Sequence, residues 1–137
     1  MLTFLRRWGP AFGLMLLIFI VSAQPKTDLP DFGVWDFLVK KGAHVAEYAL
    51  LVILMLRGLQ DAEAMHPARV TWALALTILY AISDEYHQTF VPGRIGQWPD
   101  VVVDTLGATI GLTLRHWPTL HARLRFPFRN KSGSSRR

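Results

Sequence analysis

The sequence predicts an all-α, polytopic membrane protein built as a bundle of four transmembrane helices. Half of its 137 residues are hydrophobic (51%), and 18% are charged, where a soluble domain carries about a quarter. The apolar residues also gather in four runs, each approaching the ~20 residues that cross a bilayer. These runs predict helices at about 8–24, 40–59, 67–88 and 99–117. We expect residues 1–125 to form one membrane domain, since the length fits a single domain.

The first run follows Arg6 and Arg7 and is broken at Pro25. Its charged start and short apolar stretch also match a secretory signal peptide. Three further apolar runs follow, which favours a first helix that is retained. Residues 31–40 (DFGVWDFLVK) mix acids with large apolar residues. They predict either an interfacial segment lying along the membrane surface or an extension of the second helix.

Prolines mark the later helix boundaries. Pro67 and Pro99 stand at the predicted starts of the third and fourth helices, where proline is favoured in the first turn. Pro118 is expected to end the fourth helix. The polar stretch 126–137 contains few apolar residues and is predicted to be a basic, disordered cytoplasmic tail.

Basic residues predict the orientation. Arg6 and Arg7 precede the first helix, Arg57 and Arg69 bound the loop between the second and third, and seven of the fifteen Lys and Arg residues lie from residue 115 onward, where there is no acid. The positive-inside rule then predicts a cytoplasmic (inner) membrane protein with both termini in the cytoplasm. The opposite side carries Asp28, Asp31 and Asp36, but also four basic residues that run against the rule: Lys26, Lys40, Lys41 and Arg94. The pI near 10.1 is explained by this membrane pattern, and no nucleic-acid partner is expected.

Polar residues from three helices meet at the outer end of this topology. Ionisable residues in a membrane are costly and by default mark a functional site. Residues three or four apart share a helix face, and each helix shows such a stripe. The stripes are Lys40, His44, Glu47 and Tyr48; then Asp84, His87 and Gln88; then Asp100 and Asp104, continued by Gly107 and Gly111.

Structural roles compete with functional ones at each position. His44 and Glu47 form a hydrogen-bonded pair that fixes the second and third helices in one interpretation. Asp84 and Glu85 are salt-bridge partners of Arg94 in another, since a Pro-Gly turn precedes that arginine. In the functional interpretation the same turn presents Arg94 to an anionic headgroup or phosphate.

The glycines one turn apart, Gly107 and Gly111, follow the small-xxx-small pattern that lets helix backbones approach closely. We therefore expect packing there. The pattern also permits a dimer without selecting one, so the oligomeric state stays open.

A metal site is a weaker alternative. The sequence contains no cysteine and no tight motif such as H-E-x-x-H, so no cofactor is predicted and no metal ligand is assigned. Any divalent ion would draw on nitrogen and oxygen ligands from His44, Glu47, Asp84, His87, Asp100 and Asp104.

Two segments resemble the conserved blocks of the VanZ-like family. Lys40-Lys41-Gly42-Ala43-His44, continuing to Tyr48, resembles the first block, and the stretch 83–94 (SDEYHQTFVPGR), followed by Asp100 and Gly107, resembles the second. The resemblance covers about residues 36–114, and the order S-x-D-E-x-x-Q-x-F-x-P-G-R is highly specific. One position departs from the family pattern, since many members have asparagine where this chain has Asp104.

The resemblance implies a membrane protein of unknown biochemical activity. The family is named for an accessory protein of glycopeptide resistance that lowers sensitivity to teicoplanin. Carried over by position, its pattern falls on Lys40 or Lys41, His44, Asp84, Glu85, Gln88, Phe90, Pro92, Gly93, Arg94, Asp100 and Gly107.

Two functional hypotheses follow. In the first, the protein binds or acts on an anionic envelope lipid or a lipid-linked cell-wall precursor at the outer face. Any catalysis would use His44, Asp84 and Glu85 as general acid or base. The expected ligand-binding residues are Lys41, Gln88, Arg94, Asp100 and Asp104. In the second, the protein is a non-catalytic module whose polar network fixes helix packing or recruits a partner protein.

Overall fold

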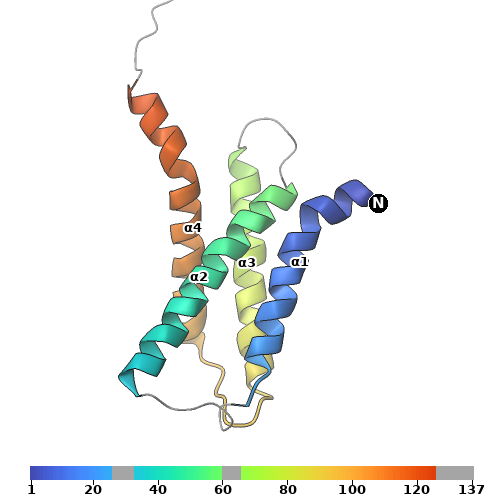
Figure 1. Ribbon diagram of the computed structural model, residues 1–137, viewed down its shortest axis with the longest axis vertical. Helices are drawn as coiled ribbons and strands as arrows, with labels where there is room; N and C mark the ends of the chain where they lie inside the picture. Colours follow the sequence, from blue (N-terminus) through green and yellow to red (C-terminus); the bar gives the residue numbers. More distant parts are fainter. Residues whose placement is uncertain (26–32, 60–65, 126–137) are drawn as a thin grey trace, which may run out of the picture.

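The computed structural model describes residues 1–25, 33–59 and 66–125, with the side chains of 36, 37 and 117–125 left out. These residues confirm the predicted all-α class. The helices are α1 (Leu2–Ser22), α2 (Val34–Leu59), α3 (Pro67–Gln88) and α4 (Trp98–Arg125). They run alternately up and down (Figure 1). We call the end where α1 begins and α4 ends the proximal end, and the end where α2 and α4 begin the distal end. The predicted tail at 126–137 and the acids Asp28 and Asp31 lie outside the described residues.

Local chemistry sets the helix starts. The ring nitrogen Nδ1 of His66 accepts the Ala68 N–H at 3.3 Å and caps α3, with Pro67 in the first turn as expected. Gly33, at a φ of +64°, precedes α2, a backbone conformation that glycine adopts without steric cost. Because α2 begins at Val34, residues 34–40 extend this helix, which is the second of the two predicted alternatives.

Two prolines lie inside helices. The prediction that Pro118 ends the fourth helix is wrong, because α4 continues to Arg125. A proline removes one N–H and crowds the carbonyl four residues earlier, but the following residues, such as Ala122 and Leu124, favour helix strongly. Pro10 lies inside α1, which begins at Leu2 rather than near residue 8. Its missing N–H leaves the Arg6 carbonyl without a helical partner, and Arg57 Nη2 of α2 donates to that oxygen at 3.4 Å.

α2 packs against all three other helices, and most extensively against the parallel helix α4. The predicted packing role of the two glycines is confirmed at this interface. A Cβ added at Gly107 would lie 2.5 Å from the carbonyl oxygen of Val45, and one added at Gly111 would collide with the carbonyl of Ala49. Because lipid is as apolar as leucine, such close backbone approach is a main source of helix association in membranes. The glycine pair is therefore used within the bundle.

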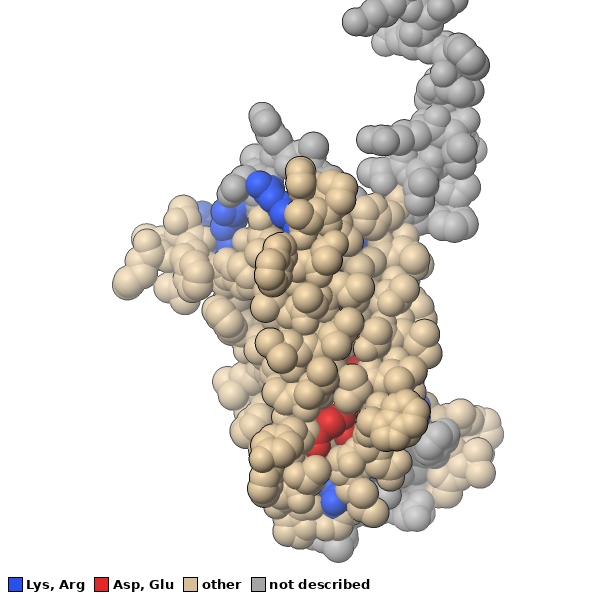
Figure 2. Space-filling view, turned by 180° about the vertical axis from the view of Figure 1, so that it is seen from behind, with Lys and Arg blue, Asp and Glu red and all other residues tan. Residues whose placement is uncertain are grey.

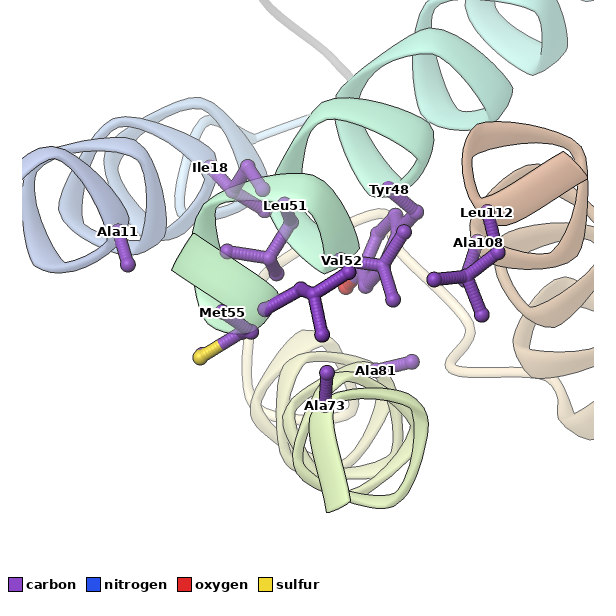
Figure 3. Close-up of a cluster of buried hydrophobic side chains, with 11 residues drawn as sticks. Ala11, Ile18, Tyr48, Leu51, Val52, Met55, Ala73, Ala81, Ala108 and Leu112 are labelled. Atoms are coloured by element: carbon purple, nitrogen blue, oxygen red, sulfur yellow. The ribbon is translucent and has the colours of Figure 1, made fainter. Parts of the chain in front are cut away.

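Small and branched side chains fill the space between the helices (Figure 3). α1 approaches α2 through Trp8, whose ring lies over Gly58 so closely that a Cβ there would be 2.7 Å from it. The buried hydrophobic residues are Ala11, Ile18, Tyr48, Leu51, Val52, Met55, Leu56, Ala73, Ala81, Ala108 and Leu112.

Large apolar side chains also cover the outside of the bundle. Leu16 and Leu17 on α1, Leu79 on α3 and Leu114 on α4 are all at least half exposed. The face in Figure 2 is mostly uncharged, with basic side chains toward the proximal end and an acidic patch, followed by a basic side chain, toward the distal end. By length and composition, Leu2–Ser22 and Leu38–Leu59 are apolar enough to cross a membrane.

Candidate functional site

The polar side chains collect at the distal end, where the connection between α3 and α4 folds back on the helices. The Arg94 N–H donates to the Val91 carbonyl at 3.1 Å, and Gly93 takes a φ of +74°. This confirms the predicted turn at Val91–Arg94. Further along, a Cβ added at Gly96 would collide with the carbonyl oxygen of Glu85. The connection therefore lies directly against the last turn of α3.

Glu85 holds this connection in place. Its carboxylate is 5% exposed and accepts the Gln97 N–H at Oε2, 2.9 Å away, while Gln88 Nε2 donates to Oε1 at 3.4 Å. A buried carboxylate needs such donors, because an unpaired one is strongly disfavoured away from water. Glu85 therefore joins the end of α3 to the start of α4.

Asp84 faces the other way, toward α1. It is 2% exposed, and its Oδ2 accepts hydrogen bonds from Ser22 Oγ at 2.9 Å and from Gln88 Nε2 at 3.0 Å. Its second oxygen, Oδ1, is buried without a partner. His87, from the same predicted stripe, also lies against α1, since its ring packs on that of Phe19 with the ring centroids 4.3 Å apart.

Arg94 caps the C-terminal end of α1. Its Nε donates to the Gln24 carbonyl at 2.9 Å, its Nη2 to the Val21 carbonyl at 3.1 Å, and its Nη1 to Gln88 Oε1 at 3.4 Å. The last carbonyls of a helix have no helical partner, so the guanidinium satisfies groups that would otherwise stay open. Among the described residues, the hydrogen bonds of Arg94 therefore go to α1 and Gln88 rather than forming the salt bridges considered with Asp84 and Glu85.

The α2–α4 interface carries a second set of polar pairs. His44 Nδ1 and Asp104 Oδ1 are 3.2 Å apart, and Lys41 forms an ion pair with Asp100. The side chains differ in exposure: Asp104 is fully buried, His44 is 23% exposed, and Lys41 and Asp100 are 29% and 27% exposed. His44 is therefore bonded across to α4, not held in the considered pair with Glu47. Lys41, His44 and Asp100 are therefore partly exposed, as is Arg94.

Tyr48 lies between these two sets. Its ring is parallel to that of His44 within 12°, with centroids 6.4 Å apart, and 6.3 Å from the ring of Tyr80. Tyr48 is fully buried, and its hydroxyl has no hydrogen-bond partner, like Asp104 Oδ2 and Asp84 Oδ1. Figure 3 shows the ring reaching from α2 toward α3 with its oxygen at the inner end.

All eight predicted site residues therefore lie at the distal end, and all but Glu85 form two groups. Asp84 and Arg94 bind the end of α1 and are linked to each other through Gln88, whereas Lys41, His44, Asp100 and Asp104 join α2 to α4. Glu85 belongs to neither group, because it bonds to Gln88 and to the Gln97 N–H just before α4. Sequence reasoning missed Ser22 and Tyr80, although a hydroxyl in the apolar run FIVSA was a signal for the first.

No three His, Asp or Glu side chains within the described ranges converge where a metal ion could bind. The metal alternative therefore has no support from the geometry. What the site offers instead is a set of hydrogen-bonded carboxylates, two of which share Gln88 as a donor. Three buried oxygen atoms and the Nδ1 of His87 are left without a partner.

Comparison with known proteins gives one result. Neither the curated proteins nor the solved structures contain a match to this chain. A family model, VanZ/LLP1, matches residues 8–118. That match reaches into all four helices and includes both polar segments that suggested the family. The chain therefore belongs to the VanZ/LLP1 family.

Proposed function

We propose that the chain is a four-span protein of the bacterial cytoplasmic membrane, with both termini in the cytoplasm and the distal end outside. There it binds or acts on an anionic envelope lipid or lipid-linked cell-wall precursor, and so affects teicoplanin susceptibility. Family membership and two helices apolar enough to cross a membrane support a membrane protein. Arg6, Arg57 and Arg69 at the proximal end support the orientation.

One observation carries the binding proposal. Lys41, Asp100 and His44 remain partly exposed at the distal end, directly beside carboxylates that are fully or almost fully buried. A partly exposed ion pair contributes little to stability, so the phosphate of a ligand can compete with Asp100 for Lys41 at small cost. The pair thus gives a ligand a cationic contact at the membrane surface.

If the protein catalyses a reaction, His44 is the best-placed proton carrier. Asp104 faces Nδ1 of the ring, which leaves Nε2 as the nitrogen directed at a ligand. A buried carboxylate that orients an imidazole is the arrangement that general-base catalysis uses. The earlier assignment of Asp84 and Glu85 as acid or base is weaker, because both are buried and occupied by structural hydrogen bonds.

A second function is favoured by a different observation. Ser22–Asp84, His44–Asp104 and Lys41–Asp100 each join two different helices. A non-catalytic module whose polar network fixes helix packing would have such pairs, since polar side chains hold membrane helices together.

One experiment on the Lys41→Ala and His44→Ala variants distinguishes the two functions. Teicoplanin susceptibility is measured in cells, alongside membrane level and thermal unfolding in detergent. The binding function predicts altered susceptibility at unchanged protein level. Parallel loss of level and melting temperature would support the packing module instead. Thr109→Ala, an exposed position on α4, is the control.

A further inference from the structure

Hydrogen-bond acceptors outnumber donors inside the distal site. Three carboxylates, those of Asp84, Glu85 and Asp104, are 5% exposed or less, and the buried polar residues of the described ranges include no lysine, arginine or histidine. Two carboxylate oxygens, Asp84 Oδ1 and Asp104 Oδ2, have no partner. Leaving such atoms unpaired is expensive, so a group that completes this site must donate hydrogen bonds or carry positive charge.

The cationic side chains nearby are already engaged. Lys41 is paired with Asp100, and Arg94 donates three hydrogen bonds to α1 carbonyls and Gln88. One ring nitrogen of His44 contacts Asp104. None of these contacts reaches Asp84 Oδ1 or Asp104 Oδ2, and neither does His87, whose Nδ1 is also buried without a partner. The missing donor therefore has to come from outside this set.

The hydroxyl oxygen of Tyr48 is a further buried atom without a partner in the distal site. Tyr48 is not an acid, is fully buried, and has a hydroxyl without a partner. One turn earlier on α2, His44 contacts Asp104, and the Tyr80 ring beside Tyr48 lies one turn before Asp84 on α3. The Tyr48 ring thus neighbours His44, which contacts Asp104, and Tyr80, which lies one turn from Asp84. Aromatic rings beside carboxylates suit an ammonium group, which is attracted to both.

The geometry distinguishes an ammonium group from a metal ion. A metal ion needs several ligands at one point, and no three His, Asp or Glu side chains converge in this way among residues 1–25, 33–59 and 66–125. An ammonium group has three N–H donors, so two carboxylate oxygens and one hydroxyl, the three open oxygens present here, match it in number.

The surroundings indicate that this ammonium group belongs to a lipid. Acidic atoms reach the surface near the distal end, with a basic side chain close beyond them and mostly uncharged residues around both (Figure 2). Large apolar side chains are exposed at the same end, with Tyr86 and Phe90 each 67% exposed at the end of α3 and Trp98 77% exposed at the start of α4. Aromatic residues of this kind lie at membrane–water interfaces.

We propose that the distal site binds the ammonium group of an amine-bearing phospholipid or lipid-linked precursor, through Asp84, Asp104 and Tyr48. This rests on the proposed function and deepens it, since the ligand then carries an amine beside the phosphate that Lys41 contacts. The amine separates such a ligand from lipids that are only anionic.

The test measures lipid retained by the detergent-purified protein, using native mass spectrometry. The protein is offered phosphatidylethanolamine, phosphatidylcholine and phosphatidylglycerol of matched acyl chains. We expect phosphatidylethanolamine to be retained about tenfold more than phosphatidylglycerol, as one charge-assisted hydrogen bond can provide. Phosphatidylcholine should fall well below it, because its quaternary ammonium has no N–H. The deacylated headgroup, glycerophosphoethanolamine, should not displace the lipid; displacement would overturn the assignment to a lipid.

The Asp104→Asn variant tests whether the carboxylate of Asp104 is responsible for the lipid preference. It keeps an oxygen that can face His44, removes one charge, and places the residue that many family members have. The preference for phosphatidylethanolamine should then fall to about twofold or less, given that charge-assisted bonds are roughly twice as strong as neutral ones. Arg115→Gln, at an exposed position in the proximal half of α4, also changes the net charge by one and should leave the preference intact.

The outcomes separate the two proposals. Equal or greater retention of phosphatidylglycerol would overturn the ammonium inference and leave the anionic-ligand proposal standing. Retention of none of the three lipids would count against both. A preference for phosphatidylethanolamine that survives Asp104→Asn would place the amine elsewhere on the protein and overturn the assignment.

Discussion

The α2–α4 interface and the attachment of α1 hold helices together by different means. α4 meets α2 backbone to backbone, where Gly107 and Gly111 leave no room for a Cβ. The distal end of α1 is instead held by hydrogen bonds, from Ser22 to Asp84 and from Arg94 to the Val21 and Gln24 carbonyls. α1 contacts α3 over a short stretch and α4 not at all among the described residues.

This difference makes the α2–α4 interface rigid and the attachment of α1 adjustable. A glycine interface depends on shape, because any added atom forces the helices apart over their whole contact. A hydrogen-bonded attachment depends on a few donors and acceptors, and each can exchange with water or a ligand. The α2–α4 pair therefore serves as the fixed frame of the site, and the end of α1 is the part that a small change can release.

The largest expected effect comes from breaking the frame. Gly107→Val would place a Cβ 2.5 Å from the Val45 carbonyl oxygen, and backbone cannot move aside cheaply. Overpacking costs about 1–3 kcal/mol and occasionally more; we expect the upper end, with the melting temperature in detergent falling by many degrees. The His44–Asp104 contact, one turn away, should be lost with it. Gly13→Ala is the matched control, since nothing lies within 4 Å of a Cβ there. A stable Gly107→Val protein would show that the interface is not the frame.

A smaller and more local effect is expected from Arg94→Lys. A lysine ammonium is a point donor and lacks the planar fork that reaches two carbonyls at once, so at least one bond to Val21 or Gln24 is lost. The loss of one or two hydrogen bonds amounts to about 1–2 kcal/mol. Amide hydrogen exchange should therefore accelerate over residues 19–24 and stay unchanged in α2.

Arg115→Lys on the exposed face of α4 is the control for that substitution. Uniform acceleration of exchange across all four helices would contradict the local role given to Arg94. Unchanged exchange over residues 19–24 would mean that Ser22 and Asp84 alone hold the end of α1.

The comparison also explains which features were predictable from the sequence. The glycine spacing and the proline-marked starts of α3 and α4 are local patterns, and both were predicted from neighbouring residues. The convergence of polar residues at one end of the bundle was also predictable. In helices that alternate in direction, the end of one helix lies beside the start of the next. Pro118 was misread because a proline marks a helix end only when the following residues do not favour helix.

The partners of the polar residues were not predictable. Asp84 lies 62 residues from Ser22 in the sequence, and Arg94 lies 70 residues from Gln24. Such contacts depend on the rotation of each helix about its own axis. A hydrophobic stripe in the sequence shows which face of a helix is buried, but it does not fix the rotation closely enough to identify individual partners. Arg94 was expected to contact either a carboxylate or an anionic ligand, and its carbonyl partners carry no side-chain signal at all.

A third prediction concerns Lys41 and Asp100, whose ion pair is more than a quarter exposed. Exposed pairs contribute about 0–1 kcal/mol, so Lys41→Ala and Asp100→Asn should each change the melting temperature by only a few degrees. A double-mutant cycle should give a coupling of the same small size. Teicoplanin susceptibility is expected to change with Lys41→Ala, since the ligand phosphate loses its contact. A coupling of several kcal/mol would assign this pair to the frame rather than to the ligand.

The smallest effect on stability is predicted for Tyr48→Phe, and it is the most informative for the site. The hydroxyl is buried without a partner, and removing an unsatisfied polar group is close to neutral or stabilises by up to about 1 kcal/mol. The melting temperature of the lipid-free protein should stay constant or rise slightly, while retention of phosphatidylethanolamine falls. Tyr80→Phe is the contrasting variant, because Tyr80 Oη donates to the Met15 carbonyl at 2.5 Å and its loss should destabilise the protein. If Tyr48→Phe destabilised the lipid-free protein as much as Tyr80→Phe, its hydroxyl would already have a structural partner, and Tyr48 would belong with the attachments that hold the helices rather than with the ligand.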